Sequence, residues 1–332
     1  MKSDARGSPH RISAGQIRLT QRLAEGDLHI YGLKQKPPER PGDIKEQLQN
    51  NIAAALVRGG KGKMMRKKNK FLTFSYDDGV TQDKRLVKIF NKYHLKASFN
   101  INSELLGRPG YLRRETMWIG HNKVEPREVS ELYRGHEIAA HTLTHPHLPE
   151  LSDEEVIRQV EQDRINLERL AGQPIYGLAY PGGGPTHDER VVKLIREHTG
   201  IRYGRTTISS YSFDVQDDLL QFRPTISHRE FDRMMELGER FIKQAVSEKP
   251  QIYYIWGHSY EFSLQDNWEL MEDFCRMMTG QEDIWYATNI QIVDYMKAAQ
   301  NLKFTIDGDL VYNPSAGSVW ISVDGEKIEI PG

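Results

Sequence analysis

The hydrophobic positions of this chain change their spacing repeatedly from residue 70 onwards. Short apolar runs rich in β-branched and aromatic residues alternate with longer segments in which apolar side chains recur every three or four residues. The first pattern is typical of buried strands and the second of amphipathic helices. We expect strands over residues 70–76, 96–102, 136–142, 175–180, 201–206, 251–258 and 284–287, and helices over 83–93, 126–135, 152–171, 188–200, 229–247, 267–278 and 290–300.

The order of these elements predicts the class of fold. About seven strand–helix units follow one another, and repeats of this kind build a parallel sheet that is covered by helices. This number of units favours a (β/α) barrel over an open sheet. Within the helix over 152–171, Ser152 and Glu155 form a capping-box pattern, and Gly172 is placed to end the helix. The central part of the chain is therefore predicted to be an α/β barrel.

Both ends of the chain differ from this repeating part. Residues 1–63 are polar and hold the loop-like stretches KPPERPG and RGGKGK, with a segment of helical spacing, 44–57, between them. We expect an extension that is partly helical or disordered, or else a docking arm for a homo-oligomer. Residues 302–332 contain short β-type runs around DGD and DGE turns, which predict a small β appendage. The predicted catalytic domain lies between them, over residues 64–301.

Composition and charge narrow the choice of partners and compartment. The 332 residues contain 45 basic and 46 acidic side chains, so the charge balance gives no reason to expect nucleic acid as a partner. No stretch of about 18 apolar residues is present, which argues against a membrane span. The single cysteine, Cys275, excludes an intrachain disulfide. Because the N-terminus lacks the apolar segment of a signal peptide, we expect a cytoplasmic protein, with a secreted or cell-surface protein as the alternative.

Four polar segments, SYDDG, HTLTH, AYPGG and WGH, follow or end predicted strands. Because the carboxyl ends of parallel strands meet at one rim, we expect these segments to converge. Two imidazoles and one carboxylate make a metal site with open positions for water. A second carboxylate beside them is placed to take a proton, and His258 is placed to protonate a leaving group. Taken singly, each segment is at least as typical of a turn or a buried histidine as of a catalytic site.

Together, these four segments resemble, in order and in approximate spacing, the polysaccharide deacetylases that share the NodB homology domain, carbohydrate esterase family 4. The resemblance covers the chain from the first predicted strand to the last predicted helix. It implies a distorted, incomplete (β/α) barrel and a divalent metal, with zinc expected and cobalt or nickel as alternatives. The roles that it implies are a catalytic base, Asp77; three metal ligands, Asp78, His141 and His145; an oxyanion donor, the main-chain N–H of Tyr180; and a catalytic acid, His258.

The chain departs from the family pattern where the family places groups that tune the base and the acid. Gly177 replaces the arginine that normally begins the third motif and pairs with the base. We therefore predict that Arg205, at the end of a neighbouring strand, holds Asp77 through two parallel hydrogen bonds. The Asp-Trp group that tunes the acid is not cleanly present, and Asp214 is its nearest candidate.

A third departure concerns the substrate pocket. Trp256 stands where a leucine of the family normally lines the acetyl pocket, and it is expected to form an apolar wall or to narrow the pocket. Gly182 lets the backbone approach a ligand closely. We expect Trp256, Pro181 and Gly182 to contact the substrate.

The resemblance leaves three hypotheses about function. The first is a metal-dependent hydrolase that removes acetyl groups from an N- or O-acetylated carbohydrate. The second is an amide hydrolase of the same fold, acting on a formyl, cyclic imide or ureide substrate. The third is a non-catalytic, carbohydrate-binding relative, against which the intact aspartates and histidines argue.

Overall fold

The structure is a computed structural model that describes residues 16–18, 70–114, 117–245, 249–306, 310–323 and 326–332. Residues 68–293 form one compact unit, and the described residues from 294 onwards belong to a second one. The helix predicted over 44–57 lies outside the described residues. The domain boundaries predicted at 63/64 and 301/302 stay predictions.

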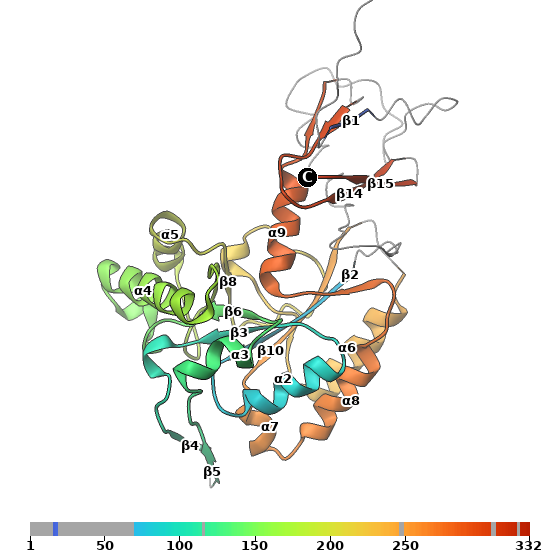
Figure 1. The fold of residues 1–332 in the computed structure, drawn as a ribbon. Helices are drawn as coiled ribbons and strands as arrows, with labels where there is room; N and C mark the ends of the chain where they lie inside the picture. The colour runs from blue at the N-terminus through green and yellow to red at the C-terminus, as the bar shows by residue number, and fades with distance from the viewer. Residues whose placement is uncertain (1–15, 19–69, 115–116, 246–248, 307–309, 324–325) are drawn as a thin grey trace, which may run out of the picture. The chain divides into compact units, whose positions relative to one another are not determined.

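The first unit is built on a parallel sheet (Figure 1). Its strands are β2 (Lys70–Asp77), β3 (Ala97–Ile101), β6 (Glu137–Ala140), β7 (Gly177–Ala179), β8 (Tyr203–Arg205), β9 (Ile226–Ser227), β10 (Gln251–Gly257) and β11 (Ile284–Tyr286). The hydrogen-bonded order is β8-β7-β6-β3-β2-β10-β9, and β11 pairs with the start of β2. Each of these pairings is parallel, and the sheet curls into a half-barrel. The predicted α/β, incomplete barrel is therefore confirmed.

The connections between the strands are helical, as the sequence pattern predicts. The helices are α2 (Asp83–Lys92), α3 (Val129–Leu132), α4 (Asp153–Ala171), α5 (Glu189–His198), α6 (Phe231–Lys243), α7 (Tyr260–Leu264), α8 (Trp268–Met278) and α9 (Asn289–Gln300). In the described part of the chain, short 3-10 turns cover Ser103–Leu105, Pro126–Glu128, Leu148–Glu150 and Leu219–Gln221. Helix α4 starts where its cap predicts, because Ser152 Oγ accepts a hydrogen bond from the Glu155 N–H at 3.4 Å, and it ends at Gly172 in the left-handed conformation.

Strand β2 explains how polar chemistry comes to lie inside this barrel. Successive side chains of a strand point to opposite faces. Phe74 and Tyr76 face the helical layer and pack against α2. Ser75 and Asp77 face the other way, where both are hydrogen-bonded to Asn100 on β3. The inner face of the sheet is therefore polar and buried, and its polar side chains continue to the carboxyl end of β2.

A hairpin that the periodicity does not predict follows β3. Its strands, β4 (Tyr111–Arg114) and β5 (Met117–Gly120), pair in antiparallel fashion. The residues directly after β5 reach the end of β2, because the Thr81 N–H donates to the Asn122 carbonyl at 2.8 Å and the Val124 N–H to the Gly79 carbonyl at 2.9 Å. Polar side chains from this connection therefore become neighbours of the aspartates.

The described strands of the second unit form short antiparallel pairings. β13 (Leu310–Tyr312) pairs with β1 (Gln16–Arg18) and with β12 (Lys303–Phe304), and β14 (Val319–Val323) pairs with β15 (Glu326–Ile330). The C-terminal β structure is thus confirmed. Among the described helices of the protein, none has the length and apolar character that crossing a membrane requires.

Candidate active site

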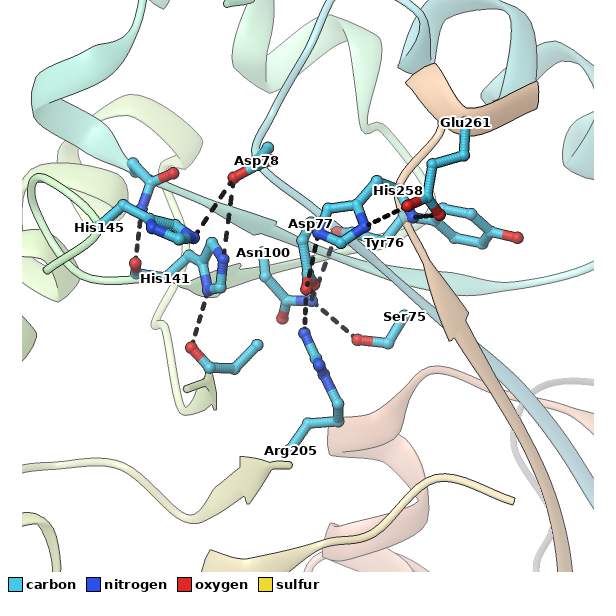
Figure 2. Close-up of polar contacts among 12 residues, drawn as sticks. Ser75, Tyr76, Asp77, Asp78, Asn100, His141, His145, Arg205, His258 and Glu261 are labelled. Carbon is cyan, nitrogen blue, oxygen red and sulfur yellow. Dashed lines mark hydrogen bonds and ion pairs between the residues drawn. The ribbon is translucent and has the colours of Figure 1, made fainter. Parts of the chain in front are cut away.

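The two adjacent aspartates at the end of β2 contact different sets of side chains (Figure 2). Asp77 is the last residue of the strand, whereas Asp78 has a φ angle of 80°, which is uncommon for a residue other than glycine. The turn places the Asp78 carboxylate beside His141 and His145 and leaves Asp77 on the other side. Backbone conformations of this kind cluster at functional sites, and His145 adopts one as well, with a φ angle of 62°.

Asp77 is buried and held from two directions. Asn100 Nδ2 donates to its Oδ1 at 2.7 Å, and Arg205 Nη2 donates to its Oδ2. Burial raises the pKa of the Asp77 carboxyl, but the positive charges near it, Arg205 first among them, lower the pKa further, so the net shift is downward. Asp77 is therefore ionised at neutral pH, as a general base must be.

Arg205 reaches Asp77 from the end of β8, as the sequence analysis predicts. Its side chain is fully buried, and its guanidinium carbon lies 4.5 Å from the ring centroid of Trp256, which packs against it. One hydrogen bond joins the two side chains instead of the two parallel ones expected, and Nη1 approaches the Thr206 carbonyl at 3.5 Å. The structure thus brings this pair together, while the catalytic part assigned to Arg205 stays a prediction.

Asp78, His141 and His145 converge as a metal site would require. One ligand atom from each residue lies within 4.8 Å of the other two. Asp78 Oδ1 is 3.9 Å from His141 Nε2 and 3.8 Å from His145 Nε2. An ion of the size of zinc lies about 2.0–2.2 Å from nitrogen and oxygen ligands, so one cation fits between the three side chains.

The protonation of the two histidines also suits a metal. His141 Nδ1 lies 2.8 Å from the Ala179 carbonyl, to which it donates, so its Nε2 carries the lone pair. This Nε2 is buried and has no hydrogen-bond partner within the described part of the chain. Burial lowers the pKa of His141 to about 4 and also lowers the pKa of His145. Both imidazoles are therefore neutral and can act as ligands.

Asp78 is fixed by two side chains that the sequence analysis missed, both from the connection after β5. His121 Nε2 lies 3.0 Å from Asp78 Oδ2, and Lys123 Nζ donates to the Asp78 main-chain carbonyl at 2.7 Å. With these contacts, Asp78 Oδ1 faces His141 and His145. Burial raises the pKa of Asp78, but the hydrogen bond from His121 and the charge of Lys123 bring it well below the usual value. Supporting contacts of this kind orient metal ligands.

Asp163 is a third residue that the sequence analysis missed. It lies on α4, fully buried, and its two oxygens accept hydrogen bonds from the main-chain N–H groups of Ser103, at 2.8 Å, and His141, at 3.0 Å. It therefore ties the backbone of a predicted metal ligand to a helix. A signal was present in the sequence, because Asp163 falls on the apolar stripe of α4 with Val160 and Leu167, where a carboxylate is costly unless it is hydrogen-bonded.

His258 follows β10 and has a carboxylate partner on the next turn of the chain. Its Nδ1 is 3.3 Å from Glu261 Oε1, and His228 Nε2 is 2.8 Å from Glu261 Oε2. Burial lowers the pKa of His258, but Glu261 and the two aspartates raise it, and the net shift is upward.

The prediction that Asp214 tunes the acid is wrong, because the Asp214 side chain is exposed and accepts a hydrogen bond from Ser212. The sequence shows Glu261 three residues after His258. The two side chains come close because helix α7 begins just after His258 and turns the chain back.

His258 also lies close to the base, whereas we expected the acid to lie across the site from Asp77. Its Nε2 is 3.9 Å from Asp77 Oδ2, so the two side chains are neighbours, as Figure 2 shows, and do not stand on opposite sides of a gap.

Comparison with known proteins agrees with this geometry. Residues 64–204 match the family model of polysaccharide deacetylase. This segment belongs to the polysaccharide deacetylase family. No curated protein matches the chain. A Mycobacterium smegmatis structure assigned to the polysaccharide deacetylases is 15% identical, with a TM-score of 0.53 over 73% of this chain and 96% of that one. At such identity the likeness shows the fold alone.

Two further solved structures are more distant in shape. A peptidoglycan deacetylase from Bacillus subtilis, PdaC, is 18% identical, with a TM-score of 0.42 over 69% of this chain and 91% of that chain. A carbohydrate esterase family 4 pseudoenzyme from Bacillus anthracis is 17% identical, with a TM-score of 0.39 over 69% and 66%.

The polysaccharide deacetylase motif AYPGG is arranged differently from the sequence interpretation. The Tyr180 N–H, expected to hold an oxyanion, donates to the Arg205 carbonyl at 3.0 Å as part of the pairing of β7 and β8, so it is not available to a substrate. Pro181 has no N–H. The Gly182 N–H is the first in this loop without a hydrogen-bond partner among the described residues, and Gly182 has a φ angle of 99°.

The side chains of this site surround a pocket of about 630 Å³. Both aspartates, the two histidines of the triad and His258 line it. Trp256 and Gly182 line it too, as expected of substrate contacts, and so does Tyr180. Pro181, the third expected contact, is buried outside this lining. A volume of this size is in the usual range for small-molecule sites.

Proposed function

We propose that this chain is a metal-dependent hydrolase that removes acetyl groups from an N- or O-acetylated carbohydrate. The observation that carries the proposal is the placement of an ionised, buried Asp77 directly beside the triad of Asp78, His141 and His145, at the wall of one pocket. Family membership of residues 64–204 supports the same reaction class. A divalent metal and a carbohydrate substrate are both part of the proposal.

Asp78, His141 and His145 would hold the metal. The unpartnered, buried Nε2 of His141 and the neutral state of both imidazoles fit a divalent cation. When bound, such a cation polarises a carbonyl and lowers the pKa of water, which makes hydrolysis possible at neutral pH. Nitrogen and carboxylate ligands suit zinc, and cobalt or nickel are the alternatives.

The remaining steps belong to residues of the chain. Asp77 accepts the proton of the attacking water, while Asn100 and Arg205 keep its carboxylate in place. We infer that the Gly182 N–H, in place of the Tyr180 N–H, donates a hydrogen bond to the oxygen on which negative charge develops. His258, whose pKa is raised, donates a proton to the departing amine or alcohol.

Acetate release tests the proposal. The protein is incubated with Zn²⁺ and acetylated chito- and xylo-oligosaccharides, and acetate is measured beside the Asp77→Asn variant. We expect release by the wild-type protein and a loss of about 100-fold or more in the variant, because the amide keeps the shape of the carboxylate but cannot take a proton. The variant should keep its metal, since Asp77 is not among the proposed ligands.

The alternatives give different results in the same assay. Hydrolysis of formyl, cyclic imide or ureide compounds without acetate release would show a different amide hydrolase. Carbohydrate binding without turnover in Zn²⁺ or Co²⁺ would show a non-catalytic relative. Turnover that survives in Asp77→Asn would contradict the role of Asp77 as the base.

A further inference from the structure

The cationic side chains around the pocket differ in their exposure. Lys123 and Arg205 are buried, with 7% and 0% of their side chains exposed, and each lies against one of the two aspartates. Arg229 also lines the pocket, but 52% of its side chain is exposed. It follows β9, at the carboxyl end of the sheet. Among the described residues that line the pocket, Arg229 is thus the cationic side chain that a ligand can contact.

A buried carboxylate holds Arg229 in place. Arg229 Nε donates to Glu261 Oε1 at 2.6 Å, and Nη2 donates to the same oxygen. Only 3% of the Glu261 side chain is exposed. Burial raises the pKa of Glu261, but the contacts with His228 and His258 bring the net pKa well below its usual value, so the carboxylate stays ionised. The guanidinium is therefore oriented before any ligand binds.

The anchored guanidinium keeps donors for a ligand. A guanidinium has five N–H groups, and Glu261 takes two of them through one edge of the fork. Tyr260, which also lines the pocket, shares a side-chain hydrogen bond with the guanidinium, so two of the five N–H groups are left for a ligand. The two Nη atoms form a second edge, and an edge of this kind matches a carboxylate with two parallel hydrogen bonds.

We propose that Arg229 binds a carboxylate of the substrate, so that the substrate is an acetylated acidic carbohydrate. This inference rests on the proposed function. Neither of the pocket's two aspartates is available to neutralise Arg229, because Arg205 and Asn100 contact Asp77. Asp78 is likewise contacted by His121 and Lys123. Covering Arg229 with a neutral sugar would remove water from a charge that only Glu261 balances, whereas a carboxylate restores its hydrogen bonds.

The test compares two forms of one substrate. An acetylated oligosaccharide containing a uronic acid is used as it is and after methyl esterification of its carboxylate. For the wild-type protein with Zn²⁺, we expect the acidic form to have a KM lower by about tenfold or more, as for other charged hydrogen bonds. Arg229→Gln should remove this difference, and Arg229→Lys should keep part of it.

A matched control separates specificity from damage to the site. Arg233 has the same degree of exposure, 51%, but stacks on Tyr211 outside the pocket lining, so Arg233→Gln should leave both KM values unchanged. If Arg229→Gln disturbs His258 through Glu261, kcat falls for both substrate forms, whereas loss of carboxylate binding raises KM for the acidic form alone.

Two outcomes would overturn the inference. One is an equal wild-type KM for the two forms. The other is an Arg229→Gln variant that raises both KM values equally. Calorimetric binding of the two forms to the zinc-loaded protein gives the same comparison without turnover. Tighter binding of the acidic form that depends on Arg229, without acetate release, would support this inference and contradict the proposed function.

Discussion

Arg205 and Asp77 form a buried hydrogen-bonded ion pair, with 0% and 3% of their side chains exposed. The two residues end β8 and β2, which are separated by three strands in the sheet, and they meet because the sheet curls. A buried charge is costly unless it is paired. Each residue therefore needs the other, and this mutual dependence explains why an arginine can stand on a different strand from the one where the family usually places it.

Removing that arginine should impair turnover and stability together. Arg205→Ala leaves Asp77 buried without its partner, which costs about 3–5 kcal/mol when a buried pair is broken. We expect a lower Tm and a lower kcat with metal still bound, and partial recovery in Arg205→Lys, which restores the charge without the planar group. Thermal unfolding, acetate release and metal content check this. Arg202, which precedes β8 and lies over the ring of Tyr176, is changed to Ala as the control. Normal turnover in Arg205→Ala would refute the role.

Substitutions at two adjacent glycines test whether the Gly182 N–H is the oxyanion donor. Gly182 has a φ angle of 99°, whereas Gly183 lies outside the left-handed region and an added Cβ there meets nothing within 4 Å. Gly182→Ala should displace the loop and lower kcat by about tenfold or more, while Gly183→Ala should retain most of the wild-type rate. Equal rates for the two variants would show that the N–H of Gly182 takes no part.

The pH dependence should report the contact of Glu261 with His258. An acid must be protonated, so turnover falls as the pH rises through the pKa of His258. Glu261 raises that pKa. Glu261→Gln removes this contribution, lowers the pKa of His258, and should move the alkaline limb of the kcat profile to lower pH. Glu272→Gln, on the surface of α8, should leave the profile unchanged. A shift to higher pH, or none, would place the proton donor elsewhere.

The sequence predicts the elements that carry strong periodicity and the residues that stand at strand ends. Asp77, Asp78, His141 and His258 were found in this way, because a parallel sheet brings the carboxyl ends of its strands together. The contact of Arg205 with Asp77 was predicted by the same argument. The prediction of two hydrogen bonds between them was wrong, because the structure has one.

The side chains that reach Asp78 from the connection after β5 were not predicted. His121 and Lys123 follow a hairpin whose strands lack a clear alternation, and only the folded chain places them beside Asp78. The prediction that the Tyr180 N–H is the oxyanion donor was wrong for a related reason. A sequence motif does not show which main-chain N–H groups are used in pairing the strands, and this one donates to the Arg205 carbonyl. Asp163 is different, since a carboxylate on an apolar helix face is visible in the sequence.

Metal removal and return is the most direct test of the central claim. The wild-type protein is treated with a chelator, acetate release from its acetylated oligosaccharide is measured, and Zn²⁺ is then added in steps, with Asp78→Asn treated in parallel. We predict that release falls to background after chelation, returns as one equivalent of Zn²⁺ binds, and does not return in Asp78→Asn. Full acetate release by the wild-type protein freed of metal, or recovery in Asp78→Asn at one equivalent of Zn²⁺, would contradict the account.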